Sequence, residues 1–201
     1  MTAIEVRPLA SLAVERWRNG GGVTRTLAAD GNRWRISLAE VERNGPYSRF
    51  DGISRLSLVL RGNGVTLRDK HTVVMLKAFE AIEYDGAADW NATLIDGPVT
   101  ALNVMTSKGR YRVKVRAIVE PLVVHAGCTA AVIATHGGCA WHDAPAEQNE
   151  GRAIDAGSFL LAESVERPIR LLPTAMTMNK AESPQLPVLV TIESASTRPN
   201  D

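Results

Sequence analysis

The sequence predicts an all-β protein built as a sandwich or a barrel. Short runs with a two-residue hydrophobic period dominate the chain, and turn-forming pairs rich in Gly, Asn, Asp and Pro separate them. A period of two is typical of half-buried β-strands, and many short strands at this spacing indicate a sandwich or barrel. Helical periodicity is scarce, and only residues 9–17 have room for a turn or two of helix.

Composition indicates an ordinary globular protein without a strong electrostatic partner. The 201 residues carry a net charge of +1, with 45% hydrophobic and 22% charged residues. A near-neutral chain has no overall attraction to nucleic acid or an anionic membrane. The sequence has no apolar run of about 18 residues and no signal-peptide pattern at its start. We therefore expect a cytoplasmic protein that binds neither nucleic acid nor membrane, with Cys128 and Cys139 as free thiols.

The first element in chain order is a glycine-rich corner. Residues 17–25 read Trp17-Arg18-Asn19-Gly20-Gly21-Gly22-Val23-Thr24-Arg25. Consecutive glycines help only where the backbone needs positive φ or passes close to something. A phosphate-binding loop is excluded, because no Lys-Ser/Thr pair and no helix follow the glycines. They are interpreted as a bulge or corner where the chain enters its first sheet, since 23–27 has the pattern of a strand.

The following strands show their pattern clearly. In 33–41 one face holds Trp34, Ile36 and Leu38, and the other holds Arg35, Ser37 and Ala39. The same alternation recurs in 56–61 and 112–117, and 181–194 is expected to return as a last strand. The strands divide into two compact β units, about 20–105 and about 110–172 with 181–194, which suit two small stacked barrels.

Several motifs resemble the HutD/Ves family. After the 17–25 motif they follow in the family's order at 34–39, 44–48, 50–55, 94–98 and 102–105. The resemblance covers roughly residues 15–110, and the later half only through its strand pattern. It implies a cupin-like fold with two double-stranded β-barrel halves, a bicupin. On this basis residues 1–107 form the first half, 108–194 the second and 195–201 a tail, all within one folding unit.

The same resemblance implies a class of function. The family is linked to histidine utilisation, where its members are thought to be small-molecule-responsive accessory proteins, and no catalytic activity is firmly assigned to it. Two departures concern the site. Asp51 stands where the family usually has Pro, and Thr100-Ala101-Leu102 stands where it usually has an Asp-Phe pair. The first could loosen a loop beside the site, and the second removes a carboxylate, so ligand choice could differ from that of histidine-pathway members.

Histidine spacing argues against a metal-dependent cupin enzyme. Two His separated by one residue point the same way from a strand and can share a metal. None of His71, His125, His136 and His142 has that spacing. One zinc alternative stays open at His136, Cys139 and His142; otherwise this is a hairpin with Cys139 and Trp141 packed inward and its His in water. We expect no metal and no cofactor.

The candidate ligand-binding site lies on a polar strand face. If Arg35 and Ser37 point into the barrel, the guanidinium offers a planar pair of donors for a carboxylate. Alternatively, Arg35 faces solvent while the opposite face of its strand fills the core. The expected ligand-binding set adds Asn103, which shares a strand face with Met105, and the residues at and around the glycines: Asn19, Gly21, Arg25, Arg35, Ser37 and Asn103.

A second charged face has a simpler interpretation. Arg110, Arg112, Lys114 and Arg116 share one strand face. Such a row is typical of a solvated face, or of an edge strand that like charges keep from pairing. With Tyr111 as the one nearby aromatic residue, it does not indicate nucleic-acid binding.

The sequence thus predicts a non-catalytic accessory or regulatory protein that binds a small, carboxylate-bearing metabolite. One alternative is a metal-free cupin isomerase or lyase acting on a small organic acid, for which Tyr47 and Glu40 are the nearby acid–base candidates. Another is an interaction protein with an exposed apolar patch and no closed pocket. A homodimer is common for such folds, although these residues do not determine the oligomeric state.

Overall fold

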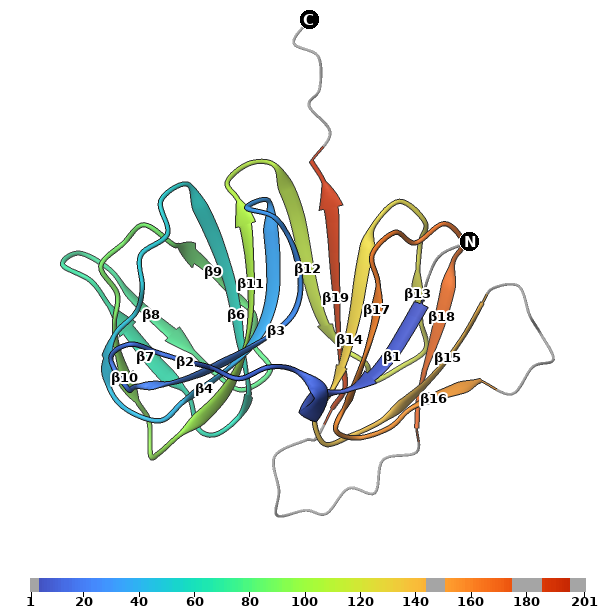
Figure 1. The fold of residues 1–201 in the computed structure, drawn as a ribbon, viewed down its shortest axis with the longest axis horizontal. Coiled ribbons are helices and arrows are strands. Elements are labelled where there is room, and N and C mark those ends of the chain that lie inside the picture. The colour runs from blue at the N-terminus through green and yellow to red at the C-terminus, as the bar shows by residue number, and fades with distance from the viewer. Residues whose placement is uncertain (1–3, 144–150, 175–185, 196–201) are drawn as a thin grey trace, which may run out of the picture. The chain divides into compact units, whose positions relative to one another are not determined.

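The structure is a computed structural model that describes residues 4–143, 151–174 and 186–195. These residues form β-strands almost throughout, which confirms the all-β prediction (Figure 1). The stretch 9–17 holds one helical turn, as expected, in the form of the 3-10 helix η1 (Leu9–Ser11), and then a short strand that was not expected, β2 (Glu15–Arg16). β2 is extended because it pairs with the strand that follows the glycines. No helix in the described ranges is long and apolar enough to cross a membrane.

The chain forms two compact units. The first unit is Leu12–Arg110, and the second combines Met1–Ser11 with Tyr111–Asp201. The second unit is therefore discontinuous in sequence: β1 (Ile4–Pro8) precedes the first unit but pairs with β17 (Ser158–Ala162) of the second.

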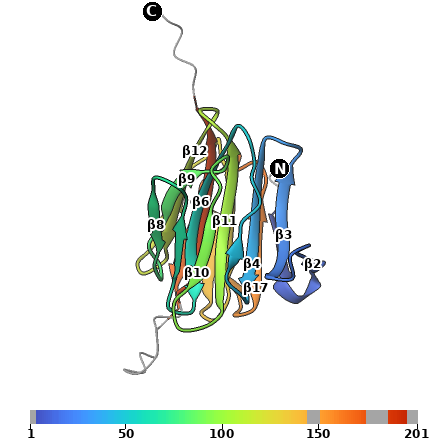
Figure 2. The same ribbon diagram turned by 90° about the vertical axis from the view of Figure 1, so that its left-hand side faces the viewer.

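The first unit contains two facing antiparallel sheets. Its six-stranded sheet has the order β2-β3-β4-β11-β6-β9, and these strands lie side by side in Figure 2. Besides β2, the sheet consists of β3 (Gly22–Asp30), β4 (Trp34–Val41), β11 (Val99–Ser107), β6 (Ile53–Arg61) and β9 (Ile82–Asp85). Its four-stranded sheet has the order β5-β10-β7-β8, from β5 (Gly45–Pro46), β10 (Asn91–Leu94), β7 (Val65–Arg68) and β8 (Val73–Leu76).

An apolar core fills one end of the space between these two sheets. Both sheets contribute buried side chains to it, among them Val41, Val59 and Val99 from the six-stranded sheet and Leu67 and Leu76 from the four-stranded one. Burying such side chains removes apolar surface from water and holds the sheets face to face.

The three central strands of the six-stranded sheet are locked in a register that decides what lies beside this core. β11 pairs with β4 on one side and with β6 on the other. The pairing aligns Asn103 with Ser37 and Ser57 in one row. Because side chains two residues apart point the same way, the next row on the same face aligns Met105 with Arg35 and Arg55. The inner face thus changes from apolar to polar along the strands.

The glycine corner brings the chain into β3 at close quarters. Gly20 has φ of +68°, and Trp17 closes the turn by donating its backbone N–H to Gly22 at 3.0 Å. Gly22 is the first residue of β3 and lies against β4, where a Cβ would overlap the backbone carbonyl oxygen of Glu40. The corner therefore requires glycine at this position for close strand approach.

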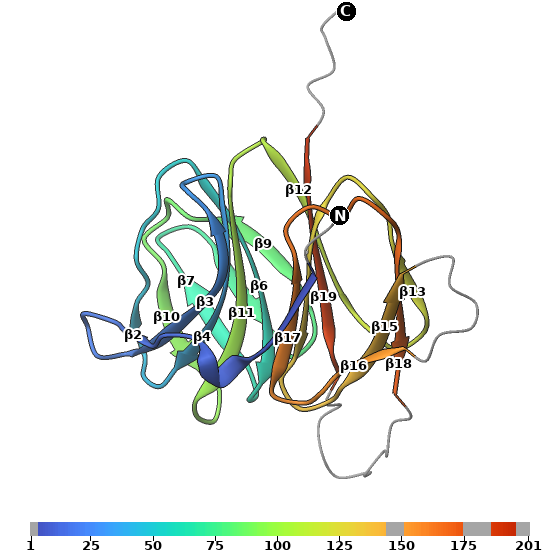
Figure 3. The same ribbon diagram turned by 45° about the vertical axis from the view of Figure 1, so that its right-hand side comes forward.

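The second unit also contains two facing sheets. One has the order β1-β17-β14-β19-β12 and includes β14 (Thr129–Ala134), β19 (Val188–Ser194) and β12 (Tyr111–Ala117). The other, visible as a layer in Figure 3, has the order β13-β18-β15-β16 and consists of β13 (Leu122–Val124), β18 (Ile169–Pro173), β15 (Cys139–Asp143) and β16 (Arg152–Ile154).

Two strand predictions fall in this unit. The last strand is confirmed over β19, whereas 181–185 lie outside the described residues. The basic strand is β12, which lies at the edge of its sheet with Arg112, Lys114 and Arg116 exposed, as the edge-strand interpretation predicts. In each of the four sheets the described strands run from one edge to another, so this pairing closes none of them into a barrel.

The close approach at Gly22 predicts a specific sensitivity. Gly22→Ala should lower the free energy of unfolding by about 2–3 kcal/mol, because the added methyl overlaps the carbonyl of Glu40 and forces β3 and β4 apart. Gly20→Ala is the control, since its Cβ meets open space and only the positive φ opposes it, at a cost of about 1 kcal/mol. Urea denaturation of both variants measures the difference, and equal losses would contradict the close approach.

Candidate functional site

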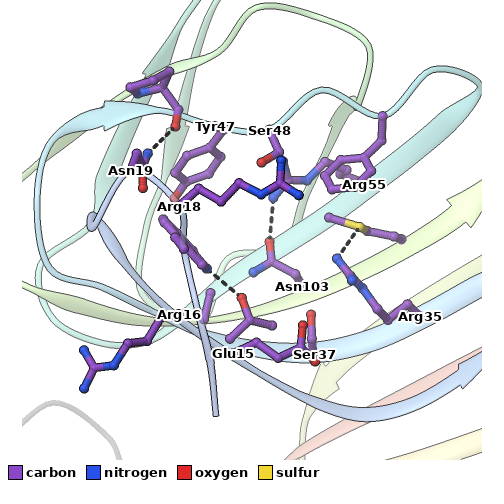
Figure 4. A pocket seen from close by; sticks show the side chains of 16 residues that line it. Glu15, Arg16, Arg18, Asn19, Arg35, Ser37, Tyr47, Ser48, Arg55 and Asn103 are labelled. Atoms are coloured by element: carbon purple, nitrogen blue, oxygen red, sulfur yellow. Dashed lines mark hydrogen bonds between the residues drawn. The ribbon is translucent and has the colours of Figure 1, made fainter.

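A cavity of about 530 Å³ opens beside the apolar core of the first unit (Figure 4). β2 and the corner after it form one wall, the loop at 46–50 forms another, and the inner face of the six-stranded sheet forms the floor. The residues that line it are Glu15, Arg16, Trp17, Arg18, Asn19, Thr24, Arg35, Ser37, Ala39, Pro46, Tyr47, Ser48, Phe50, Arg55, Asn103 and Met105.

The floor presents hydrogen-bond donors. Asn103 accepts hydrogen bonds on Oδ1 from Ser57 Oγ at 2.6 Å and from Arg55 Nη2 at 3.4 Å. A guanidinium can only donate, so the amide oxygen must face Arg55 and the NH₂ group of Asn103 is left for the cavity. Ser37 lies beside Asn103 in the same row and lines the cavity with its hydroxyl. Both groups can donate to an acceptor in the cavity.

Arg55 is a buried cation held by aromatic rings. Only 6% of its surface is exposed, and its Cζ lies 5.2 Å, 5.3 Å and 5.8 Å from the ring centroids of Tyr47, Tyr84 and Phe50. Aromatic faces stabilise a guanidinium but do not neutralise it. Its Nε has no hydrogen-bond partner, and no carboxylate of the described residues pairs with it.

Arg35 is a second cation, which lies in the same row of the sheet as Arg55 on the other side of Met105. It is half-buried, donates from Nη2 to the Sδ of Met105 at 3.3 Å, and lies 5.8 Å from the Phe50 ring centroid. Its Nε is also without a partner, and no ion pair within the described ranges reaches it. A thioether is a weak acceptor, so the two guanidiniums leave strong donors unused inside one cavity.

The walls add aromatic surface and more positive charge. Trp17 and Tyr47 meet edge to face with centroids 5.8 Å apart, and Trp17 Nε1 donates to Thr24 Oγ1 at 2.8 Å. Burial, together with the nearby Tyr84, raises the pKa of Tyr47 well above its usual range, although Arg55 acts in the opposite direction. Tyr47 is therefore a neutral phenol. Arg16 and Arg18 lie on the exposed rim, where Glu15 is the one acidic residue of the lining.

Four of the six residues that the sequence proposed for ligand binding line the cavity: Asn19, Arg35, Ser37 and Asn103. Arg35 belongs to the cavity face of β4 and is not free in solvent. Asn19 also shapes the corner, because it accepts the N–H of Gly21 at 2.9 Å and donates to the carbonyl of Pro46 at 3.1 Å.

The other two proposed residues, Gly21 and Arg25, are not part of the lining. The carbonyl of Gly21 accepts backbone N–H bonds from Glu42 and Arg43, which fixes the corner against the end of β4. Arg25 forms an ion pair with Glu40 on the neighbouring strand. This pair also engages Glu40, which the sequence offered as an acid–base candidate and which lies outside the lining.

Arg55 is the cavity residue that the sequence analysis missed. A signal was present, since Arg55 precedes Ser57 and Val59 at the two-residue period that places all three on one strand face. Once Arg35 is taken to point inward, the same reasoning applies to this face of β6. What the sequence could not supply is the register that puts Arg35 and Arg55 on either side of Met105.

The segment from His136 to His142 has the arrangement of the hairpin alternative, with Cys139 and Trp141 packed inward. Cys139 and Trp141 are buried in the core of the second unit, and His136 is exposed, as the hairpin alternative predicts. Across the described ranges, no three His, Cys, Asp or Glu side chains gather as a metal-ligand group.

Facing antiparallel sheets with a donor-lined cavity at one end define this chain as a cupin-like all-β protein. The match to the family model for HutD extends over residues 9–178. The chain belongs to the HutD family, as the resemblance predicted.

Relatives with curated names support the same grouping. The chain is 32% identical over 107 residues to an uncharacterised protein in the hutC 3′ region of Pseudomonas putida, covering 50% of this chain and 56% of that protein. It is 32% identical over 120 residues to protein Ves of Citrobacter koseri, covering 56% of this chain and 63% of Ves. The matched part thus spans less than two thirds of either relative.

Solved structures share the fold over nearly the whole chain. A conserved protein of unknown function from Pseudomonas aeruginosa superposes with a TM-score of 0.79 at 26% identity, covering 96% of this chain and all of that one. HutD from Pseudomonas fluorescens gives a TM-score of 0.73 at 20% identity with the same coverage, which at this identity shows the fold alone.

Arg55 on the cavity floor predicts that two substitutions, at Arg55 and at its acceptor Asn103, affect the free energy of unfolding differently. Arg55→Met keeps an apolar stem and removes a buried charge without a carboxylate partner, so the free energy of unfolding should stay within about 1 kcal/mol of the parent or rise. Asn103→Ala should lower it by about 2–3 kcal/mol, because Ser57 and Arg55 lose their shared acceptor. Thermal and urea denaturation measure both. A large loss in Arg55→Met would show that the guanidinium is structural.

The buried thiol in the second unit predicts a pH dependence. Burial raises the pKa of Cys139 to about 11 from its ordinary 9.0. The folded state then holds the thiol proton more tightly than the unfolded state does. The protonated thiol therefore makes its full contribution to the free energy of unfolding below pH 9, and this contribution is lost as the pH rises towards 11. Between pH 9 and pH 11, the free energy of unfolding of the wild-type protein should fall by on the order of 2 kcal/mol more than that of Cys139→Ala. Parallel pH curves for the two proteins would contradict the burial of this thiol.

Proposed function

We propose that this protein is a non-catalytic accessory or regulatory protein that binds a small carboxylate-bearing metabolite in the cavity of the first unit. The observation that carries the proposal is the pair Arg35 and Arg55, two guanidiniums that face one cavity without a carboxylate partner among the described residues. Guanidinium and carboxylate match in shape and charge, and each such pair gives two parallel hydrogen bonds.

The remaining polar groups of the floor support an acceptor-rich ligand. The hydroxyl of Ser37 and the NH₂ group of Asn103 lie in the row next to the arginines and can donate to the same carboxylate or to a neighbouring oxygen. Trp17, Tyr47 and Phe50 supply apolar surface around them. The cavity thus combines apolar surface with several convergent polar groups, and a small-ligand site uses such polar groups to fix the orientation of its ligand.

The non-catalytic part of the proposal rests on the acid–base groups. General acid–base chemistry needs a group whose pKa lies near the working pH and that reaches the substrate. Tyr47 has a raised pKa and stays neutral, Glu40 is paired with Arg25 outside the cavity, and Glu15 lies on the exposed rim. None of these is a suitable base at the floor, where the arginines would hold the ligand.

The biological setting is proposed from the relatives. One is named for its position in a hutC 3′ region, and a protein of the same fold is named HutD. These names support a role linked to histidine or amino-acid catabolism. We propose that the protein fulfils this role in the cytoplasm. We also propose that each unit, with its two facing sheets, corresponds to one cupin-like half of a bicupin.

Ligand binding should be measurable as added stability. A panel of urocanate, histidine, formylated glutamate and related amino-acid derivatives is screened by thermal shift. A ligand present at 100 times its Kd adds about 2.7 kcal/mol, or roughly 5–10 °C for a chain of this length. Arg35→Ala should lower the affinity of a hit at least about tenfold, because it removes a charged double donor.

Arg25→Gln is the matched control, since it removes a guanidinium outside the cavity lining. It should leave the affinity unchanged. The proposal fails if no metabolite in a broad panel shifts the melting temperature, or if Arg35→Ala binds as the parent does. Consumption of a bound hit, followed by NMR, would instead identify an enzyme.

A further inference from the structure

We infer that the ligand carries two acidic groups, one for each guanidinium of the cavity floor, and is a short dicarboxylic acid. The inference rests on the proposed function, and it adds the charge and shape that the ligand must have. It follows from the register of three strands and from the charges that line the cavity.

The charge of the interior comes from two residues. Arg55 is buried and Arg35 is half-buried, and each has an Nε without a hydrogen-bond partner. The other charged residues of the lining, Glu15, Arg16 and Arg18, are exposed, so water screens them. The interior therefore carries two positive charges that the described chain leaves uncompensated. A ligand with one negative charge would neutralise only half of this.

The two cations reach the cavity from different strands. Arg35 and Arg55 lie on the strands on either side of β11, with Met105 between them in the same row. Neighbouring strands are about 4.8 Å apart, so the two Cα atoms are separated by roughly 10 Å. Both Cζ atoms lie 5.8 Å from the centroid of Phe50, so the distance between them cannot exceed twice that value. Both guanidiniums thus border one small space, which their side chains enter from the strands on either side of β11.

Two guanidiniums that reach one cavity from two different strands favour a ligand with two carboxylates. A single carboxylate has two oxygens, which one guanidinium occupies when it binds both. The second guanidinium then needs a second carboxylate. Met105 supplies apolar surface between the two arginines, which suits the short carbon chain that joins the carboxylates. A cavity of about 530 Å³ has ample room for such a molecule.

The test compares ligands that differ by one charge at constant shape. Isothermal titration calorimetry with the full chain measures succinate, glutarate and adipate, each against its half-amide, and inorganic phosphate as a single group with two charges. The best dicarboxylate should bind about 10- to 100-fold more tightly than its half-amide, because the neutral amide leaves one guanidinium without a counter-charge.

Variants test whether the two arginines cause the preference for a dicarboxylate over its half-amide. Arg35→Gln and Arg55→Gln should each reduce the ratio between dicarboxylate and half-amide to within about threefold, since one charge-matched partner is gone. Arg33→Gln, which removes an exposed arginine paired with Asp30, should leave the ratio unchanged. Circular dichroism checks the fold of each variant. The wild-type ratio decides the question even if Arg55→Gln does not fold.

Each other outcome overturns the inference in a recognisable way. Equal affinity for a dicarboxylate and its half-amide, or binding of monocarboxylates alone, would mean a single anchor and would leave the proposed function intact. Tighter binding of phosphate than of any dicarboxylate would mean a site for one doubly charged group. Failure of every carboxylate, including those of the metabolite screen, would remove the proposed function as well.

Discussion

The site depends on one constraint, the register in which β4, β11 and β6 pair. That register places Arg35, Met105 and Arg55 in one row and Ser37, Asn103 and Ser57 in the next. A shift of one residue in either pairing would turn the affected polar side chains to the other face of the sheet. The apolar residues further along the same strands hold the register, because Val41, Val59 and Val99 are buried between the two sheets. Core packing at one end of the strands therefore positions the donors at the other.

This arrangement carries a cost in stability. The two guanidiniums border one cavity and repel each other, and neither has a carboxylate partner among the described residues. The aromatic rings around Arg55 and the amide of Asn103 offset part of this cost. Functional sites commonly retain such unfavourable groups because a ligand relieves them. In the proposed function, the floor would be arranged for an anion before one binds.

Much of the fold and part of the site followed from the sequence, for physical reasons that differ between residues. The two-residue period predicted the strands and the shared face of Arg35 and Ser37, because that period is local. It did not identify Arg55, whose neighbours across the sheet lie 20 and 50 residues away in sequence at Arg35 and Met105. Gly21 and Arg25 were proposed for the site because Gly21 lies in the glycine corner and Arg25 follows it, but neither lines the cavity and Arg25 pairs with Glu40. Nearness in sequence was a poor guide where strand pairing decides direction.

The discontinuous second unit has a consequence for synthesis of the chain on the ribosome. The first unit, Leu12–Arg110, is contiguous, so all its strands have left the exit tunnel before most of the second unit is made. β1 is made before the whole of the first unit, yet its partner β17 begins only at Ser158. Domains generally fold as they emerge, at about 5–20 residues per second. β1 therefore has to wait for β17 to be made before it can take up its place in the sheet.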